Sequence, residues 1–460
     1  MDLQTLFYHS KQKQKTLHPI QHRITVLKKL KAILKQNQSS LITAIAKDYG
    51  HRSTHETLLG EFFPFYKELD YIIRHIKAWT KTKSVHIDAW YQPAKAKLQL
   101  QPLGTVGIIV PWNYPLFLAL SPMIAAIAAG NNCLVKISEY TPHLGHALAE
   151  LINREFAEYG IAIVNGDATL ASEFSQLPFD YLFYTGGPTI GKKIMAAAST
   201  HLTPVTLELG GKSPVIIDDK INLNEAITCI LRGKLFNAGQ TCIAPDYIFV
   251  PEQRKQAFIH VAKKIALQMY PELKNNPDYS NIINQRHYQR LKSLLDDALD
   301  KGAEFIPLSN IIDEDSQKFQ PGLLINILEE MHIMRDEIFG PLLPIKTYKD
   351  ISEVLQYIKT HPHPLTIYAF TRDSLLQKLI SEQTLSGSLC FNETLLHIVQ
   401  NRLPFGGVGQ SGFGQYRGKY GVETFSKLKP VYYQGKLHPA NLFKPPYGAK
   451  FKALMKFLLM

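Results

Sequence analysis

The sequence has few cysteines and lacks several motifs that would define its chemistry. Its 460 residues include four cysteines, Cys133, Cys229, Cys242 and Cys390. They form no CxxC pair and no cluster with histidine at zinc-binding spacing, which excludes a disulfide framework and a structural zinc site. The motifs HExxH, GxxxxGK[ST] and GxSxG are also absent, which argues against the enzyme classes that carry them. We therefore expect no bound metal, a reducing compartment and a cytoplasmic location.

The chain also lacks a signal segment and a focused basic patch. Residues 1–15 contain no apolar core of the kind that a signal peptide needs. The net charge is +12, but Lys and Arg are spread over most of the chain and are densest within residues 11–35. Nucleic-acid binding would need a focused patch and a reading module. We expect neither a secreted nor a nucleic-acid-binding protein.

One uncharged run, residues 103–135, is long enough to span a bilayer. Pro111, Asn113, Pro115 and Pro122 interrupt it, and a lipid-exposed helix would leave backbone groups unpaired there. We interpret the run as a buried strand, a loop and a buried helix.

Hydrophobic spacing predicts two helical stretches, at 18–48 and 53–81, and Pro64 is expected to kink or split the second. Residues 84–102 alternate and are polar, which favours an extended arm or hairpin. From residue 103 short apolar strands alternate with helices, which predicts parallel sheets covered on both faces. The predicted strands are 106–110, 132–137, 161–164, 179–184, 205–208, 214–217, 246–250, 341–347, 365–370 and 387–391. The predicted helices among them are 116–129, 143–158, 168–176, 189–198, 222–237, 252–269 and 285–301.

Cys242 lies in the stretch 236–245, which reads Phe-Asn-Ala-Gly-Gln-Thr-Cys-Ile-Ala-Pro. Small and polar residues precede the thiol and Pro245 follows it, so neither a helix nor a regular strand continues through this point. A thiol at such a bend can face a cleft. A free cysteine is, however, usually a small buried hydrophobe, and this stretch alone does not decide between the two interpretations.

A glycine-rich turn, 183–191, follows an apolar strand and opens a helix. Its glycines allow close approach of a phosphate, and the helix start offers free N–H groups. At the end of an earlier strand, Lys136 and Glu139 could bind a ribose diol, although such charges are often only solvated. The turn and this pair together are compatible with a nucleotide site.

Glu208 and Asn113 are candidates for acid–base and oxyanion roles. Glu208 lies between Leu207 and Leu209, where burial would raise its carboxyl pKa and suit a general base. A salt-bridged glutamate at a strand end is the alternative. Asn113 follows a predicted strand, and its amide could donate to an oxyanion, although an asparagine between two prolines is also ordinary turn chemistry.

These motifs, taken in order, resemble the aldehyde dehydrogenase superfamily. The set is Pro-Trp-Asn (111–113), Lys-Ile-Ser-Glu (136–139), Thr-Gly-Gly-Pro-Thr-Ile-Gly (185–191), Leu-Glu-Leu-Gly-Gly-Lys (207–212), Gly-Gln-Thr-Cys (239–242), Glu-Ile-Phe-Gly-Pro (337–341) and Leu-Pro-Phe-Gly-Gly (403–407). The short N-terminus, the Cys-Ile-Ala-Pro-Asp sequence and the Lys-Pro-Pro-Tyr-Gly tail resemble class 3, which includes fatty, aromatic and bacterial coniferyl aldehyde dehydrogenases.

The resemblance implies an α/β fold with a Rossmann-like parallel-sheet cofactor domain, an α/β catalytic domain and a small β oligomerisation arm. The implied boundaries are 1–83 with 103–207 for the NAD(P)-binding domain and 208–395 for the catalytic domain. Residues 84–102 and 396–460 would form the arm and the C-terminal tail. The implied assembly is a homodimer. In the tail, Phe451, Leu454, Met455 and Leu458 share one helical face, which fits packing on a partner subunit or attachment to a membrane surface.

The resemblance also implies catalytic roles. Cys242 would attack the aldehyde carbonyl as a thiolate, so the site is expected to favour the anion. Asn113 and the backbone N–H of Cys242 would hold the oxyanion. Glu208 would activate the water that hydrolyses the resulting thioester. An aldehyde, medium- to long-chain aliphatic or aromatic such as coniferaldehyde, would become a carboxylic acid.

The implied cofactor is NAD, with NADP possible. Lys136 and Glu139 would contact the adenosine ribose, and Glu139 would repel a 2′-phosphate. Glu337 would hold the nicotinamide ribose, with Phe339 near the ring. The other implied contacts are Trp112, Gly186, Gly187, Pro188, Thr189, Ile190, Gly191 and Leu209. Two positions depart from the commoner pattern, because Ile137 stands where proline is usual and Pro188 where a small polar residue is usual.

Three alternatives remain open on the sequence. A CoA-acylating relative would release the thioester to CoA, and Glu208 argues against it. A cofactor-free thiol hydrolase would need a histidine paired with Cys242, and none lies nearby in sequence. A catalytically silent binding or structural protein would need neither Cys242, Glu208 nor Asn113. The pocket walls are expected to include Tyr66, Trp112, Tyr114, Phe391 and His397.

Overall fold

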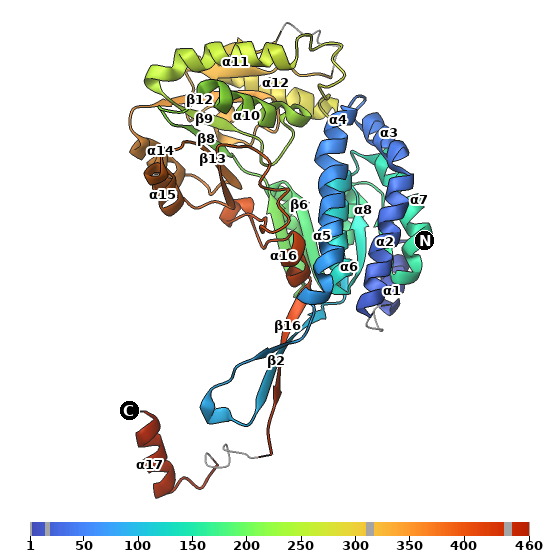
Figure 1. Ribbon diagram of the computed structural model, residues 1–460. Coiled ribbons are helices and arrows are strands. Elements are labelled where there is room, and N and C mark those ends of the chain that lie inside the picture. Colours follow the sequence, from blue (N-terminus) through green and yellow to red (C-terminus); the bar gives the residue numbers. More distant parts are fainter. Residues whose placement is uncertain (1, 14–18, 310–316, 437–443, 460) are drawn as a thin grey trace.

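The structure is a computed structural model that describes residues 2–13, 19–309, 317–436 and 444–459. Among these residues the strands form three sheets, of six, seven and three strands. Two α/β bodies carry the larger sheets, and a narrow ribbon projects from one of them (Figure 1). The predicted α/β fold class, with a Rossmann-like parallel sheet, a second α/β unit and a small β arm, is confirmed.

The first large sheet has the strand order β15-β7-β6-β3-β4-β5. All neighbours are parallel except the short edge strand β15. Its strands are β3 (Thr105–Ile109), β4 (Asn132–Lys136), β5 (Ile161–Val164), β6 (Tyr181–Gly186), β7 (Val205–Leu209) and β15 (Gly412–Phe413). The helices that connect or cover them are α1 (Leu3–Lys13), α6 (Pro115–Ala129), α7 (Pro142–Phe156), α8 (Ala168–Ser175) and α9 (Pro188–Ser199).

The strand order of the first sheet indicates where a ligand would bind. The chain runs outward from β3 to β4 and β5, then returns to lay β6 and β7 on the other side of β3. The order therefore reverses between β3 and β6, and open parallel sheets bind ligands at the carboxyl ends of the strands at such a point. Residues 110–113 follow β3 and residues 187–191 follow β6, so the two predicted motifs meet at this edge.

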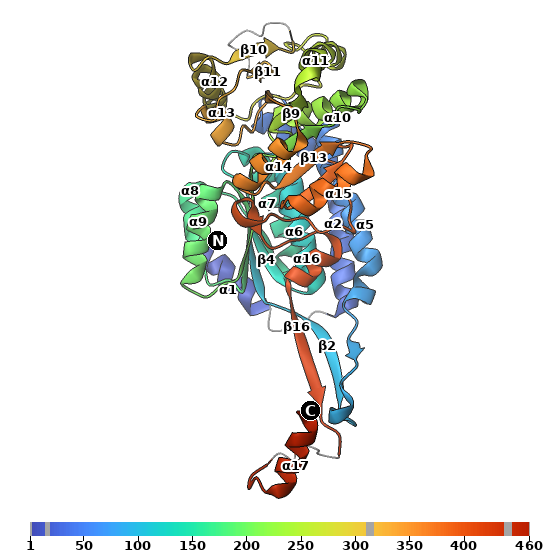
Figure 2. The same ribbon diagram turned by 90° about the vertical axis from the view of Figure 1, so that its left-hand side faces the viewer.

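The second large sheet has the order β10-β11-β12-β9-β8-β13-β14 and is parallel except for β10. Figure 2 shows it above the first sheet. Its strands are β8 (Pro214–Ile217), β9 (Tyr247–Pro251), β10 (Glu304–Pro307), β11 (Gly322–Ile325), β12 (Leu342–Tyr348), β13 (Thr366–Phe370) and β14 (Ser388–Phe391). Its main helices are α10 (Leu223–Leu235), α11 (Lys255–Met269), α12 (Gln285–Asp300), α14 (Ile351–Thr360) and α15 (Ser374–Gln383).

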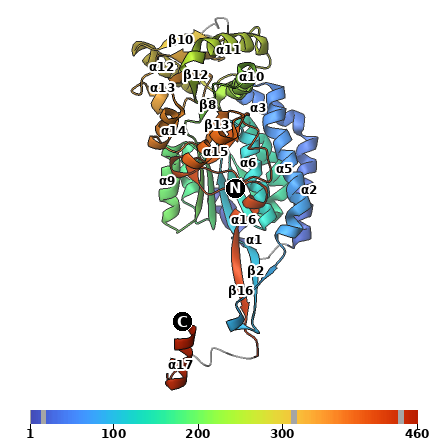
Figure 3. The ribbon, with the colours of Figure 1, turned by 60° about the vertical axis from the view of Figure 1, so that its left-hand side comes forward.

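The ribbon is the predicted arm with one additional strand. β1 (Lys83–Val85) and β2 (Lys95–Pro102) pair antiparallel, and β16 (Ser426–Tyr433) pairs with β2 along its whole length. Beyond the arm, α17 (Ala449–Leu458) stands apart from the rest of the chain in all three views (Figure 3). The tail is helical, as its spacing predicts.

The N-terminal helices differ in detail from the prediction. The stretch 18–48 is two helices, α2 (Ile20–Gln36) and α3 (Gln38–Asp48), and residue 18 lies outside the described residues. The stretch 53–81 is α4 (Thr54–Thr57), a π-helical turn at Leu58–Phe62 and α5 (Phe63–Trp79). Pro64 lies in the first turn of α5, where a missing N–H costs nothing. The backbone stays helical from α4 to α5, with a π-helical turn just before Pro64, so the helix is locally widened but not split.

The uncharged run 103–135 is β3, α6 and β4, as predicted, and every residue of α6 is buried. No helix in the described parts of the chain is long and apolar enough to cross a bilayer. The domain boundaries drawn from the sequence stay a prediction, and β7 runs across the one placed between residues 207 and 208.

Candidate active site

Two cavities meet at Cys242. One, of about 470 Å³, lies at the reversal point of the first sheet and has polar walls that include Asn113 and Glu208. The other, of about 270 Å³, lies between α5, α6 and residues 394–399 and is largely apolar. Cys242 lines both cavities and is half-buried. The bend around the thiol therefore faces a cleft, and its interpretation as a fully buried hydrophobe is wrong.

The loop before Cys242 has an unusual backbone. Asn237, Ala238 and Gly239 all adopt left-handed conformations, with φ of 51°, 50° and 76°. A Cβ on Gly239 would lie 2.3 Å from the carbonyl oxygen of Gly340, so only glycine fits there. The buried Gln240 amide donates to the carbonyls of Asn237 and Asn281, 3.0 Å away in each case. These contacts fix the loop that presents the thiol.

The protein's own charges oppose ionisation of the thiol. Burial is the main cause, and the Glu337 and Glu208 carboxylates add to it, raising the Cys242 pKa from 9.0 to about 12. The backbone N–H groups of Cys242 and Ile243 act in the opposite direction but more weakly. The expectation that the site favours the thiolate is therefore wrong for the protein without its ligands.

Asn113 lies beside the cysteine loop. Its side chain is 2% exposed, and its amide nitrogen donates to the Gln240 carbonyl over 3.1 Å. The backbone carbonyl of Asn113 in turn accepts from the Asn237 side chain at 3.1 Å. One amide hydrogen of Asn113 is fixed by Gln240, and the second is left for a group in the cavity.

Glu208 is buried without a partner. It is 3% exposed, and neither carboxyl oxygen has a hydrogen-bond partner among the residues that the structure describes. It pairs in register with Thr185 of β6 and Gly412 of β15. Burial raises the pKa of Glu208 well above 4.5, as its apolar neighbours predict, and no salt bridge forms. The alternative of a salt-bridged glutamate is wrong.

Glu337 and Phe339 come from a segment before β12. The Phe339 ring lies edge-on to Trp112 at 5.3 Å between ring centroids, and both line the polar cavity. Burial is the main reason that the Glu337 pKa rises to about 8, and Asp246 also raises it. The Glu337 carboxylate lies against Gly210, where a Cβ would fall 2.0 Å from its oxygen. Glycine at 210 therefore makes room for this side chain.

Buried ionic contacts hold the Glu337 segment in place. The Asp246 carboxylate accepts from the backbone N–H of Ile338 at 2.9 Å and pairs with Lys212. Lys212 also donates to the Asp336 carbonyl at 2.9 Å. Arg290 donates to the carbonyls of residues 337–339, the shortest contact being 2.6 Å. The segment is thus tied to β9 and α12.

The glycine-rich turn opens onto the polar cavity. A Cβ on Gly187 would meet no atom within 4 Å, and the buried Thr185 hydroxyl has no partner. Pro188 occupies the first turn of α9, where its missing N–H is not needed. The predicted contacts that line this cavity are Trp112, Gly186, Gly187, Pro188, Thr189, Leu209, Glu337 and Phe339.

Four predicted cofactor contacts lie outside the cavity wall. Lys136 is 1% exposed, and its ammonium donates to the carbonyls of Ile137 and Gly166 at 2.6 and 2.8 Å. Glu139 and Ile190 are exposed, and Gly191 packs against Leu209. Their roles stay a prediction.

Two polar cavity residues have no counterpart in the sequence motifs. His287 and Arg290 of α12 line the polar cavity. The His287 ring packs on Trp112 at 4.8 Å, and burial lowers its pKa to about 4. No described histidine is hydrogen-bonded to Cys242, which removes the support for a cofactor-free thiol hydrolase. Only the helical spacing of α12 was visible in the sequence, and it gave no sign of a site.

The apolar cavity differs from the predicted pocket walls. Tyr114 lines it, and its hydroxyl is hydrogen-bonded to that of Thr241 at 2.7 Å. Trp112 lines the polar cavity instead. Tyr66, Phe391 and His397 line neither cavity, so these three expectations are wrong. Phe391 belongs to β14, and His397 lies within hydrogen-bond distance of Ser388 at 3.1 Å.

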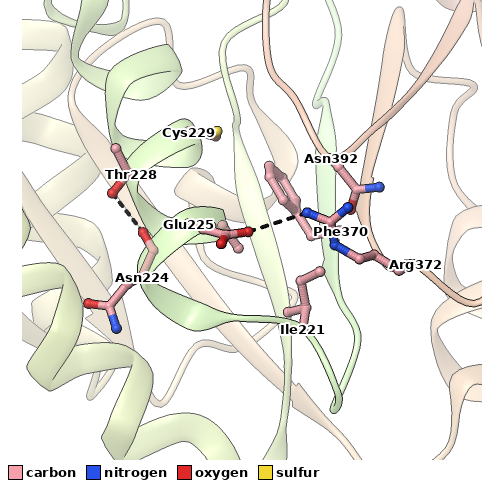
Figure 4. A pocket seen from close by; sticks show the side chains of 9 residues that line it. Ile221, Asn224, Glu225, Thr228, Cys229, Phe370, Arg372 and Asn392 are labelled. Atoms are coloured by element: carbon pink, nitrogen blue, oxygen red, sulfur yellow. Dashed lines mark hydrogen bonds and ion pairs between the residues drawn. The ribbon is translucent and has the colours of Figure 1, made fainter.

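A separate pocket of about 500 Å³ lies on the second sheet and shares no lining residue with the other two cavities (Figure 4). Arg372 and Glu225, which both line it, form an ion pair of 3.4 Å, and Cys229 also belongs to its lining. Burial raises the Cys229 pKa, so this thiol is not activated. The pocket contains none of the predicted site residues.

A doubly wound sheet with a glycine turn at its reversal point, and a cysteine between a polar and an apolar cavity, define an NAD(P)-dependent oxidoreductase. Comparison with known proteins identifies the family. The model of the aldehyde dehydrogenase family matches residues 6–431. The chain belongs to this family and has aldehyde dehydrogenase activity.

Individual relatives agree with this assignment. The chain is 44% identical over 433 residues to a probable coniferyl aldehyde dehydrogenase of Pseudomonas aeruginosa, covering 94% of this chain and 90% of the relative. It is 37% identical over 445 residues to aldehyde dehydrogenase family 3 member A2 of Mus musculus, covering 96% and 90% of the two chains. The solved structure of Staphylococcus aureus AldH in its substrate-bound state matches with a TM-score of 0.94 and 38% identity, covering 100% of both chains. The class 3 resemblance is confirmed.

Proposed function

We propose that the protein oxidises apolar aldehydes, aliphatic or aromatic, to carboxylic acids with NAD, through an acyl thioester on Cys242. The observation that carries this proposal is that Cys242 lines both cavities, with Asn113 and Glu208 in the polar one. An aldehyde entering along the apolar cavity would bring its carbonyl to the thiol. The hydride acceptor would occupy the polar cavity on the other side of Cys242.

Asn113 and the backbone N–H of Cys242 would stabilise the first intermediate. Attack of the thiolate on the carbonyl carbon forms a C–S bond and moves the carbonyl electron pair onto oxygen. The second amide hydrogen of Asn113 would donate to that oxygen, since the first is held by Gln240. Removal of one oxyanion donor typically costs a factor of about 10²–10³ in rate.

Glu208 would act in the second half of the reaction. Its carboxyl group is buried and its pKa is raised, so its ionised form would be a stronger base toward water than an exposed carboxylate. Hydroxide from that water attacks the thioester carbon, the C–S bond breaks, and the carboxylic acid leaves. This role distinguishes a hydrolytic enzyme from a CoA-acylating one, which would have no use for a water-activating base.

The polar cavity fits a nicotinamide dinucleotide. Gly187 has open space before it, Thr185 has a buried hydroxyl without a partner among the described residues, and α9 begins at Pro188, which lines the cavity. Glu337, Trp112 and Phe339 would hold the nicotinamide half, as the resemblance implies. The bound cofactor supplies the hydride acceptor. Glu139 favours NAD over NADP because its charge would repel a 2′-phosphate.

The apolar cavity supports the substrate class. Its walls come mainly from aromatic and aliphatic side chains, and its volume is about 270 Å³. A relative named for coniferyl aldehyde, an aromatic aldehyde, matches almost the whole chain. Burial of an apolar chain here contributes roughly 25 cal/mol per Å² of apolar surface removed from water.

We also propose a cytoplasmic homodimer assembled through the arm. β16 is paired only on its β2 side and carries large exposed apolar residues, Leu428, Tyr432 and Tyr433. A second chain that covers this surface would remove an open strand edge, which isolated proteins rarely leave exposed. The apolar face of α17 would pack on the partner, with a membrane surface as the less favoured use. Sedimentation velocity would test the dimer.

Absorbance of the reduced nicotinamide provides the test of the activity. The purified protein would be mixed with NAD or NADP and with hexanal, decanal, benzaldehyde or coniferaldehyde. We expect reduced cofactor with NAD and at least one aldehyde, and none with Cys242→Ala. Absence of reduction with every pair would refute the proposal, and reduction that requires CoA would identify the acylating alternative.

A further inference from the structure

A groove along α5 continues the apolar cavity toward the protein surface. It is lined by one face of α5 and by residues 399–403, and its volume is about 650 Å³. Phe63, Pro64 and Val399 line both the groove and the apolar cavity. The two spaces are therefore neighbours that share a wall at the mouth of the substrate cavity.

The character of the walls changes along this path. Beside Cys242 the cavity is apolar, whereas the groove carries Lys67, Arg74 and Arg402, all exposed. None of the described residues that line the groove is an Asp or Glu. Lys67 and Arg74 follow Phe63 by four and eleven positions on α5, which places all three on the same helix face. At about 1.5 Å per residue, the basic stretch extends up to about 16 Å from the mouth.

Among the described residues, no carboxylate forms an ion pair with the three cations of the groove. The two carboxylates of α5 beside Lys67 are used elsewhere, since Glu68 pairs with buried Arg417 and Asp70 pairs with Lys31. The Arg74 Nε atom donates only to the Asp70 backbone carbonyl, at 3.2 Å. The Lys67 ammonium lies over the Phe63 ring, 5.6 Å from its centroid. Such cations favour an anion when one is delivered to them.

From this arrangement we infer that the preferred substrates are long apolar aldehydes whose far end carries a carboxylate, that is, ω-oxo carboxylic acids. This inference rests on the proposed function of Cys242. The aldehyde end and apolar chain occupy the cavity, and the distant carboxylate lies among Lys67, Arg74 and Arg402. Oxidation of such a substrate yields a dicarboxylic acid, with the second carboxylate formed at Cys242.

The test compares substrates that differ only at the far end. Steady-state kinetics would be measured for ω-oxo acids of six to sixteen carbons, for the methyl esters of the same acids and for the plain aldehydes of equal length. We expect KM to fall for the free acids once the chain spans the cavity, by about tenfold relative to the esters, which corresponds to about 1.4 kcal/mol. High salt should remove that difference, because exposed charges are screened.

Two matched triple variants distinguish an effect of the groove cations from an effect of the overall charge of the protein. The triple variant Lys67→Gln, Arg74→Gln, Arg402→Gln should raise KM about tenfold for long ω-oxo acids and leave kcat and the plain aldehydes unchanged. The control triple variant is Lys220→Gln, Lys263→Gln, Lys264→Gln, which removes the same charge from exposed sites on the second α/β body. It should leave KM and kcat unchanged for both the ω-oxo acids and the plain aldehydes.

The outcomes distinguish this inference from the proposed function. If no aldehyde is oxidised, the proposed function itself fails. If acids, esters and plain aldehydes of one length share the same KM, or if both triple variants behave alike, only the inference is overturned. It is also overturned if the groove variant affects plain aldehydes presented in anionic vesicles but not dissolved ω-oxo acids, since the groove would then bind a lipid surface.

Discussion

The pKa of Cys242 gives the sharpest prediction. Burial, Glu337 and Glu208 raise that pKa to about 12 in the protein alone. At pH 8 the thiolate fraction is then about one in ten thousand, whereas an ordinary thiol with a pKa of ~8.5 is about one quarter ionised. Alkylation of Cys242 by iodoacetamide should therefore be on the order of 10³-fold slower at pH 8 than alkylation of a free cysteine.

Replacement of Glu337 tests the electrostatic part of this pKa. Glu337 has a pKa of about 8, so it is largely neutral below pH 7 and carries its charge above pH 9. Glu337 contributes more to the raised Cys242 pKa than Glu208 does, and a change of one pKa unit corresponds to about 1.4 kcal/mol. Glu337→Gln should thus lower the Cys242 pKa by about one unit and speed alkylation about tenfold at pH 10, with no difference at pH 6.

The assay is the rate of mass gain on the peptide that contains Cys242, measured from pH 6 to 11. Cys242→Ala reports the background from Cys229 and Cys390. Asp336→Asn is the matched control, because Asp336 lines the same cavity one residue away. An alkylation midpoint near 8.5 in the free enzyme, or equal profiles for wild type and Glu337→Gln, would refute the reasoning. Oxidised NAD should shift the profile to lower pH, since a nearby positive charge favours the thiolate.

Three further predictions address the site and its support. Asn113→Ala should lower kcat/KM by about 10²–10³-fold, while KM for NAD, measured by initial rates, stays the same. Glu208→Gln should retain one burst of reduced cofactor per site but turn over poorly, and unchanged steady-state turnover would contradict its role as base. Glu61→Gln should destabilise the fold by about 3–5 kcal/mol in urea denaturation, because it leaves Arg52 buried without its 2.8 Å ion pair, whereas Glu150→Gln on the surface of α7 should be neutral within about 1 kcal/mol.

The central strands and helices of both large sheets could be predicted from the sequence because each is a short apolar run bounded by turn residues. β5, β8 and α6 lie within one residue of their predicted ends. Sequence reasoning missed β10, β11, β15 and β16, and the last two of these depend on partners far along the chain. β15, for example, has two residues and exists only because β7 lies beside it. Pairing of that kind leaves no local pattern.

The residues of the candidate site also divide into those that a local sequence motif reveals and those that only the fold brings together. Cys242, Glu208 and Asn113 were found because their motifs resemble a known family, and the topology brings their elements to one cavity. His287 and Arg290 were missed because α12 carries an ordinary amphipathic pattern. The thiol pKa was predicted in the wrong direction because a sequence shows neither the burial of Cys242 nor the approach of Glu337, which comes from a segment about ninety-five residues away along the printed chain.

The raised pKa values around Cys242 have one physical cause and one consequence. Thiol and carboxyl groups that are buried together with few polar partners all prefer their neutral forms. A protonated thiol is a weak nucleophile, so Cys242 is protected from oxidation and alkylation while the cavities hold only water. The positive charge of oxidised NAD would favour thiolate formation. The same burial raises the pKa of Glu208, so this carboxyl group must give up its own proton before it can accept one from water once the thioester has formed.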